Sequence, residues 1–341
     1  MRKVPVTEAV GLVLCHDITE IIPGSRKGRA FKKGHAIRPE DVPKLQDLGK
    51  RHVYVWEPGP DLVHENEAAL RLAREAAGPG LSWGRPDQGR VNLRAERDGL
   101  FKVQLDRLQR LNTLDGIVFA TLHNNRVVAR GQVVAGTRVV PLAISRGILE
   151  EAGRFCREPA PLLAVKTFQP LWVGVVTTGS EVYEGRVKDG FCSVIRRKTA
   201  PFGARLLGQV IVPDDPDCIA QEIRRMIGEG AELVLVTGGM SVDPDDVTPL
   251  GIRATGADVV FYGAPVLPGS MFMLAYLGHV PICGLPGCVM FNRTTIFDLL
   301  LPRLFAGERI SREEVLALHG GLCEECPDCR FPACAFGKAT D

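Results

Sequence analysis

The stretch that decides the fold is residues 233–249, LVLVTGGMSVDPDDVTP. Its four leading apolar residues predict a short strand that is buried on both faces, as strands of parallel sheets are. Two glycines follow the strand, and an acid-rich segment then leads into a helix expected at 247–254. A strand, a glycine-rich turn and a helix in this order are typical of α/β domains that bind an anion at the helix start.

The same arrangement occurs twice more along the chain. It is found in residues 171–181, LWVGVVTTGSE, and in residues 280–288, VPICGLPGC. In an open α/β sheet, ligands bind outside the carboxyl ends of the strands, and glycine lets the backbone come close to an anion. One glycine after a strand is usually just a turn, but three such junctions in one domain predict a shared binding site.

Apolar strand patterns alternate with helix-length segments throughout this part of the chain. We expect strands at 171–177, 207–212, 233–236 and 258–262, a β pair at 272–276 and 280–283, and helices at 193–206, 217–227, 247–254 and 290–304. Such alternation predicts the α/β class, with a doubly wound and mainly parallel sheet over residues 165–305.

The N-terminal half has a different pattern, with short strands separated by Gly and Pro. We predict a β-rich α+β domain over residues 1–160, with room for two subdomains at about 1–60 and 90–160. His123 to Arg126 is expected to be a hairpin turn that joins strands at 117–122 and 127–129. Proline at 159 and 161 predicts a linker before the second domain.

Acidic residues cluster beside the second glycine pair, at Asp243, Asp245 and Asp246. Carboxylates near a phosphate-binding loop suit Mg²⁺, which takes one or two of them together with phosphate oxygens and water. A second acidic turn, Asp214-Asp215-Pro216-Asp217, also follows a predicted strand. Aspartate at a helix start is a common N-cap, so we expect one aspartate of this second turn to cap the following helix.

The three junctions together resemble a known family. TTGSE at 177–181, TGGMS with Asp246 downstream at 237–246, and LPG at 285–287 resemble the molybdopterin-binding domain of molybdenum-cofactor biosynthesis proteins. This domain is shared by the MoeA type, molybdopterin molybdotransferase, and the MogA type, molybdopterin adenylyltransferase. The resemblance covers about residues 165–305. It implies a doubly wound α/β fold that binds the phosphate end of the pterin with Mg²⁺.

The resemblance also implies roles for individual residues. Asp246 and Asp215 would be catalytic, and Asp246 would also be the Mg²⁺ ligand. The residues implied to bind the cofactor are Thr178, Gly179, Ser180, Glu181, Gly238, Gly239, Ser241, Pro286 and Gly287.

The sequence departs from the family at two places. MoeA-type proteins have Asn-Pro after the third loop, where this chain has Cys288 and Val289, and their N-terminal Ser-x-x-Asp-Gly-Tyr-Ala signature is absent. We therefore expect a molybdopterin-binding protein of cofactor biosynthesis, either molybdotransferase-like or adenylyltransferase-like. Two alternatives stay open: a non-catalytic cofactor carrier or sensor, and a CinA-like nucleotide-processing relative.

Four of the ten cysteines fall in the tail, residues 320–341, with the spacing C-x2-C-x2-C-x4-C. Four thiols within so short a span predict a metal or cluster site rather than disulfides. An iron–sulfur cluster and Zn²⁺ both stay open. We expect a mobile appendage that metal orders, with Cys323, Cys326, Cys329 and Cys334 as its ligands.

Composition narrows the choice of partners. The chain has 42 Lys and Arg against 40 Asp and Glu, a net charge of +2, which gives no argument for nucleic-acid binding. No run of about 18 apolar residues occurs, and the N-terminus has no apolar signal region, so we expect no membrane contact and a cytoplasmic location. The expected partners are molybdopterin or its adenylylated form, a molybdoenzyme, and further copies of the chain in a homo-oligomer.

Overall fold

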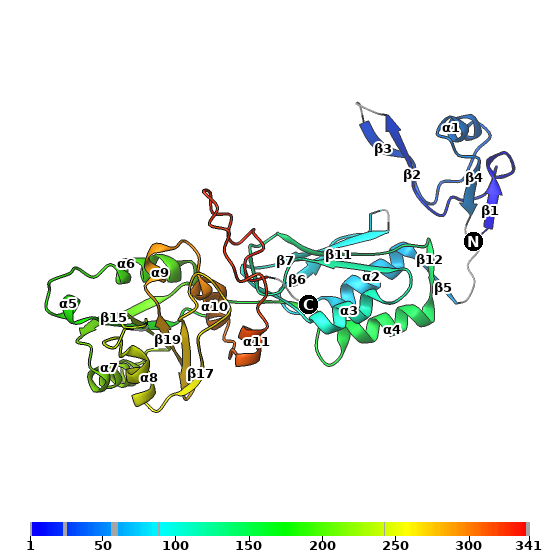
Figure 1. Cartoon of the computed structure of the whole chain (residues 1–341). Helices are drawn as coiled ribbons and strands as arrows, with labels where there is room; N and C mark the ends of the chain where they lie inside the picture. Colours follow the sequence, from blue (N-terminus) through cyan, green and yellow to red (C-terminus); the bar gives the residue numbers. More distant parts are fainter. Residues whose placement is uncertain (1, 23–25, 56–60, 88, 242, 339–341) are drawn as a thin grey trace. The chain divides into compact units, whose positions relative to one another are not determined.

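The computed structural model describes residues 2–22, 26–55, 61–87, 89–241 and 243–338. The chain divides into two compact units. The first comprises residues 1–97, 102–122 and 129–165, and the second comprises residues 98–101, 123–128 and 166–341. Figure 1 shows the elements of each unit along the chain.

The N-terminal part of the first unit is built from two antiparallel strand pairs. β1 (Arg2–Pro5) pairs with β4 (His52–Val55), and β2 (Ile18–Ile22) pairs with β3 (Arg26–Phe31). They are accompanied by the 3-10 turn η1 (Val6–Glu8) and the helix α1 (Asp41–Asp47). Buried side chains from these elements, with Leu14, Ile37 and Leu45 nearly inaccessible, form a small core.

The rest of the first unit is a four-stranded antiparallel sheet that packs against helices. Its strand order is β6 (Leu81–Trp83), β7 (Arg90–Ala95), β11 (Val133–Val139) and β9 (Ile117–Thr121). α2 lies on this sheet and buries a stripe of alanines that lets α4 pack closely. The remaining elements are β5 (Leu62–His64), α2 (Glu65–Ala76), α3 (Leu105–Asn112), β12 (Ala143–Ser145), α4 (Arg146–Arg157) and β13 (Leu163–Lys166).

The second unit contains a six-stranded mixed sheet. Its order is β15 (Arg205–Val212), β14 (Trp172–Thr178), β16 (Leu233–Thr237), β19 (Val280–Leu285), β18 (Met273–Leu277) and β17 (Asp258–Tyr262). β15, β14, β16 and β19 run parallel, whereas β18 and β17 are antiparallel to their neighbours. The predicted α/β class is confirmed, and the sheet is parallel in its first four strands. β10 (Arg126–Val128) pairs antiparallel with β8 (Gly99–Val103).

The sheet of the second unit has a hydrophobic core on each face. β16 shows why: Leu233 and Leu235 belong to one cluster, and Val234 and Val236 belong to the other. Successive side chains of a strand point to opposite faces, so a wholly apolar run is what a strand covered on both sides requires. Figure 1 shows α7 and α8 on one face of the sheet, and α6, α9 and α10 on the other.

The described part of the second unit contains seven helices and one 3-10 turn, and two of the predicted helices differ from those observed. Residues 193–206 were expected to form one helix, but α6 ends at Thr199 and β15 begins at Arg205. The expected helix at 290–304 is two helices, α9 and α10, with a break between them. The bounds are α5 (Ser180–Tyr183), α6 (Phe191–Thr199), η2 (Ala200–Phe202), α7 (Pro216–Gly228), α8 (Thr248–Ala254), α9 (Cys288–Phe291), α10 (Ile296–Phe305) and α11 (Arg312–Leu316).

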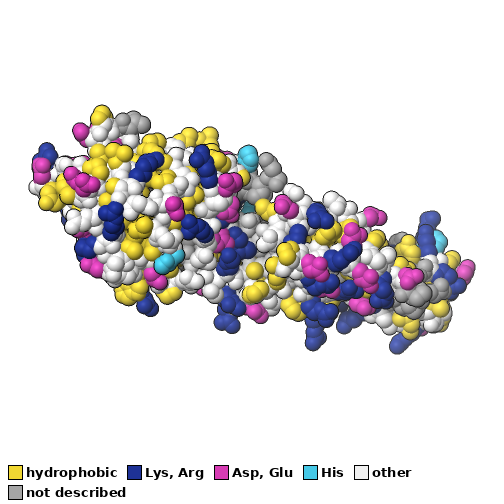
Figure 2. Space-filling view, turned by 90° about the horizontal axis from the view of Figure 1, so that it is seen from below, with side chains coloured by type: hydrophobic (Ala, Val, Ile, Leu, Met, Phe, Trp, Pro, Cys, Tyr) yellow, Lys and Arg dark blue, Asp and Glu magenta, His cyan; other side chains and the backbone are white. Residues whose placement is uncertain are grey.

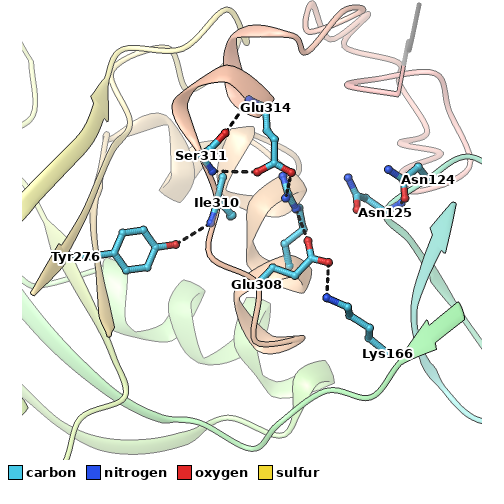
Figure 3. A network of polar contacts seen from close by, with 9 residues as sticks. Asn124, Asn125, Lys166, Tyr276, Glu308, Ile310, Ser311 and Glu314 are labelled. Atoms are coloured by element: carbon cyan, nitrogen blue, oxygen red, sulfur yellow. Dashed lines mark hydrogen bonds and ion pairs between the residues drawn. The ribbon is translucent and has the colours of Figure 1, made fainter. Parts of the chain in front are cut away.

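A buried ion-pair network holds the segment after α10 in place. The Arg303 guanidinium donates to Glu308 Oε2 at 2.8 Å and to Glu314 Oε1 at 2.6 Å. Lys166 Nζ adds a contact of 3.0 Å to Glu308 Oε1 (Figure 3). Arg303 and Glu308 are only 6% and 7% exposed, so each charge depends on the other for compensation.

We expect Arg303→Met to destabilise the second unit by about 3–5 kcal/mol, because it leaves the buried Glu308 carboxylate without its guanidinium partner. Denaturant unfolding of the full chain measures the change. The matched control is Arg225→Met, which removes two ion pairs on an exposed surface and should change the unfolding midpoint little. Equal midpoints for Arg303→Met and the control would contradict the role given to the network.

Among the residues placed by the structure, no helix is long and apolar enough to cross a bilayer. Lys and Arg side chains are interspersed with Asp and Glu over the face seen in Figure 2, so that face carries no extended field of one sign.

Candidate functional site

The first two glycine-rich loops lie at the same edge of the second unit's sheet. β14 and β16 are parallel neighbours in register, with Thr177 beside Thr237, and both loops leave from their carboxyl ends. The third loop leaves from β19, whose Leu285 lies beside Thr237. The three junctions predicted from the sequence therefore meet at one edge, as the rule for open α/β sheets requires.

Gly238 is required by the way the first two loops pack. Its φ is +89°, and a Cβ built there would lie 2.3 Å from the carbonyl oxygen of Thr178. The buried Thr178 hydroxyl makes a 3.0 Å hydrogen bond with the Thr248 hydroxyl at the start of α8. A side chain at Gly239 would come within 2.7 Å of that same Thr248 hydroxyl. These glycines and threonines hold the two loops together.

Each loop is also fixed by a carboxylate that accepts a backbone hydrogen bond. The N–H of Ser180 donates to Asp214 Oδ2 at 2.7 Å, which ties the first loop to the turn after β15. The N–H of Ser241 donates to Asp246 Oδ2 at 2.6 Å, which closes the second loop on itself. Asp245 N–H donates to Asp243 Oδ1 at 3.1 Å within the same loop.

Loops one and two and the turn after β15 enclose a hollow of about 620 Å³, which we call the acidic hollow. Its described lining carries five carboxylates and one guanidinium, that of Arg186. A phosphate would be repelled by such a surface unless a cation accompanied it. The lining residues are Ser180, Glu181, Arg186, Asp214, Ser241, Asp243, Asp245, Asp246 and Val247.

The structure sorts the predicted binding residues into three groups. Ser180, Glu181, Ser241 and Asp246 line the acidic hollow. Thr178, Gly179, Gly238 and Gly239 shape the loops behind it. Pro286 and Gly287 belong to the third loop at the same sheet edge but are not part of the hollow's lining.

The acidic turn after β15 corrects the sequence-based choice of residue. Asp215 caps α7, because its Oδ1 accepts the Cys218 N–H at 2.8 Å, and it is not part of the hollow's lining. The expectation that one aspartate of this turn is an N-cap is confirmed. Asp214 faces the hollow instead, and sequence reasoning missed it because the two aspartates are adjacent and chemically identical. Arg186 was also missed, since no motif marks it.

The two aspartates should give opposite results when each is changed to Ala. The Cys218 N–H holds the pKa of Asp215 below its ordinary value. Because the pKa of Asp215 is lower in the folded state than in the unfolded state, its charged form stabilises the fold at pH 7. This contribution is lost as the pH falls to about 3.9, the ordinary pKa of aspartate, and below.

We therefore expect Asp215→Ala to lower the melting temperature at pH 7, with a smaller difference at acidic pH, and to leave ligand binding unchanged. Asp214→Ala releases the Ser180 N–H and should weaken binding in the hollow. Thermal unfolding at several pH values and calorimetry with molybdopterin measure the two effects. A larger binding loss for Asp215→Ala would overturn the assignment.

The tail cysteines lie outside the acidic hollow. Cys323, Cys326, Cys329 and Cys334 are all free and partly accessible thiols, and none lines the hollow. Among the described residues, there is no group of three or more His, Cys, Asp or Glu side chains that could hold a metal ion. The structure therefore contains no ready-made metal centre in the described part of the chain, at the hollow or in the tail.

The fold and the loops together define an α/β domain whose glycine-rich loops meet at the carboxyl ends of its parallel strands. Residues 174–306 match the family described as "Probable molybdopterin binding domain". Residues 3–57 match a "Domain of unknown function (DUF8806)".

Two similar proteins each match less than half of this chain. A molybdopterin molybdenumtransferase from Synechococcus elongatus is 28% identical over 153 residues, which is 40% of this chain and 38% of that protein. A CinA-like protein from Citrifermentans bemidjiense is 34% identical over 88 residues, 26% of this chain and 21% of that protein. The chain thus spans less than half the length of these relatives.

Among solved structures, the tungsten cofactor synthesizing protein MoaB from Pyrococcus furiosus is 21% identical. The match covers 36% of this chain and 84% of that chain, with a TM-score of 0.29.

Proposed function

We propose that the second unit binds the phosphate end of molybdopterin, or of its adenylylated form, in the acidic hollow. The observation that supports this most directly is the convergence of two glycine-rich loops and an acidic turn on one hollow at the carboxyl ends of β14 and β16. The match of residues 174–306 to the molybdopterin-binding family supplies the identity of the ligand. The residues themselves indicate an anion together with a cation.

The donor set of the hollow fits Mg²⁺. Mg²⁺ binds oxygen ligands and commonly takes one or two carboxylates, with phosphate oxygens and water completing its shell. A group of three protein ligands is therefore not required, and the carboxylates of Asp214 and Asp246 are already held in place by backbone N–H donors. We propose that Asp246 holds the ion, with Asp214 as its nearest alternative. When bound, Mg²⁺ would neutralise charge on the phosphate.

The protein's own groups would position the phosphate. Asp246 fixes the second loop through Ser241, and Asp214 fixes the first loop through Ser180. Preorganised groups of this kind lower the cost of orienting a bound phosphate. In an adenylyl transfer, a pterin phosphate oxygen would displace pyrophosphate from ATP. In molybdenum insertion, the adenylylated pterin would take up molybdenum and release AMP.

We propose a transferase of one of these two kinds, because the Synechococcus relative is a molybdopterin molybdenumtransferase. A non-catalytic carrier or sensor is the second candidate. It is favoured by Cys288 and Val289 at the third loop and by residues 3–57, which match a family of their own. Incubating the full chain with molybdopterin, ATP and molybdate separates the two. Pyrophosphate or AMP release with turnover supports the transferase, and stoichiometric binding without turnover supports the carrier.

We propose in addition that the protein acts as a cytoplasmic homo-oligomer and passes its cofactor to a molybdoenzyme. Light scattering coupled to size-exclusion chromatography tests the first point, and a mass equal to one chain would contradict it.

A further inference from the structure

The tail is closed on itself and bound to the rest of the second unit. Gly337 N–H donates to the carbonyl of Gly320 at 2.8 Å, so residues 320–337 form a closed loop. Near its start, Leu322 forms a bridge with Leu267, with hydrogen bonds of 2.7 and 2.8 Å on either side. We call this segment the cysteine loop.

The far end of the cysteine loop is packed into the core. Phe336 is 5% exposed and belongs to the same hydrophobic cluster as α10. A side chain at Gly337 would lie 2.3 Å from Leu299 Cδ1, so the backbone passes directly against that helix. Buried apolar contacts therefore attach the far end of the segment to the second unit, and its mobility without metal stays a prediction.

All four tail cysteines line one cavity. A hollow of about 400 Å³ is enclosed by the cysteine loop and by Phe291–Thr294, the turn after α9, and Cys323, Cys326, Cys329 and Cys334 all belong to its lining. Between Cys323 and Cys334 the chain forms no helix or strand, so its torsions can change without breaking regular hydrogen bonds. The thiols share one space but must move inward to reach a common centre, since they are not grouped for a metal ion now.

The spacing of the cysteines and the volume of the cavity distinguish a zinc site from an iron–sulfur cluster site. Structural zinc sites usually take paired cysteines from two separate segments and close tightly around one ion, at Zn–S distances of about 2.3 Å. Here three cysteines follow at two-residue intervals, as do the first three cysteines of the local runs that hold iron–sulfur clusters, and the fourth lies five residues further along the chain. A cavity of about 400 Å³ is also much larger than a single ion needs.

Side chains at the rim of the cavity provide a hydroxyl and apolar rings of the kind found around iron–sulfur clusters. The Thr294 hydroxyl lies 3.6 Å from Cys329 Sγ, within reach of a weak hydrogen bond to sulfur. Phe331 and Phe336 pack edge to face beside it. Hydrogen bonds to the sulfurs and a partly apolar surround are features that tune iron–sulfur centres.

We propose that the cysteine loop binds a [4Fe–4S] cluster through the thiolates of Cys323, Cys326, Cys329 and Cys334. This site is separate from the acidic hollow and goes beyond the function proposed there. Loading is a redox-neutral ligand exchange when a preassembled cluster carried by small thiolates is supplied. Each cysteine Sγ–Fe bond replaces an Fe–S bond to a small thiolate, which leaves with the cysteine proton.

The test is anaerobic incubation of the full chain with such a preassembled cluster, followed by desalting. We expect about four iron and four sulfide per chain and broad visible absorption. Cys329→Ser and Cys326→Ser should each lower cluster affinity by about tenfold or more. The matched control is Cys192→Ser, a partly accessible thiol in α6 that does not line the cavity, and it should load like the wild type.

Three results would overturn the proposal. They are no iron retained by the wild type, equal loading of Cys329→Ser and Cys192→Ser, or retention of one zinc with exclusion of the cluster when both are supplied. Circular dichroism of each variant before loading identifies a folding defect. The Cys326 thiol donates a weak hydrogen bond of 3.9 Å to the exposed Glu324 carboxylate, so Cys326→Ser is expected to fold normally. Pterin binding in the acidic hollow is measured separately, so failure of one site is not mistaken for failure of the other.

Discussion

Replacing Asp246 with Asn is expected to weaken Mg²⁺-dependent binding of molybdopterin by about 10- to 100-fold. The amide oxygen of Asn can still accept the Ser241 N–H, so the loop keeps its shape while the negative charge is lost. The carboxylates around the acidic hollow otherwise repel a phosphate, and the change removes the one we assign to the cation. Equilibrium dialysis at several Mg²⁺ concentrations measures the effect.

Asp243→Asn is the matched control for this variant. Asp243 lines the same hollow and accepts a hydrogen bond from Asp245 N–H, so the two variants remove the same charge from neighbouring positions. We expect its Mg²⁺ dependence to remain close to that of the wild type. If Asp243→Asn lost more affinity than Asp246→Asn, the assignment of the ion to Asp246 would be wrong.

Gly238→Ala is expected to destabilise the second unit by roughly 2–5 kcal/mol and to abolish pterin binding. The added methyl group would lie 2.3 Å from the Thr178 carbonyl oxygen and 2.8 Å from its hydroxyl, so the two loops must separate. The backbone at Gly238 also has φ of +89°, which a side chain disfavours. Denaturant unfolding and calorimetry measure stability and binding on the same preparation.

Gly256→Ala is the control that separates the cost of a positive φ from the cost of the steric overlap at Gly238. Gly256 has a similar φ of +80°, but no atom lies within 4 Å of the Cβ position. We expect it to cost only the strain, about 1–2 kcal/mol, and to leave binding intact. Equal effects of the two variants would show that close packing of the loops is not what requires glycine at 238.

Much of the second unit follows from the sequence because its strands bury both faces. The run Leu233–Val236 is apolar at every position, and only a strand covered on both sides needs that pattern. The strand predicted at 258–262 coincides with β17, and the helix predicted at 217–227 with most of α7. The glycine-rich junctions were located correctly because each follows such a strand.

The wrong secondary-structure predictions lie where the local sequence pattern does not determine which segments pair in the fold. Residues 117–122 and 127–129 were expected to form a hairpin, but β9 pairs with β11 and β10 pairs with β8, so neither strand pairs with the other. The break between α9 and α10 had a local signal that we missed. Thr295 and Asp298 form a capping box at the start of α10, a spacing recognisable in the sequence.

The composition of the site could be predicted, but the orientation of its side chains could not. The sequence places Asp214 and Asp215 side by side, and only the start of α7 decides that Asp215 turns back to the Cys218 N–H. The participation of Arg186 depends on where the segment after α5 runs, which no periodicity specifies. The enclosure of the tail cysteines by the turn after α9 likewise depends on tertiary packing.

Calorimetry of the full chain with molybdopterin, in the presence and absence of Mg²⁺, tests the central claim that the acidic hollow binds the phosphate end of the pterin with a cation. We predict binding of about one pterin per chain that requires Mg²⁺ and is lost on chelation. AMP alone should bind more weakly, because it lacks the pterin. Mg²⁺-dependent binding of AMP or ATP without any binding of molybdopterin would contradict the claim and would favour a nucleotide-processing protein.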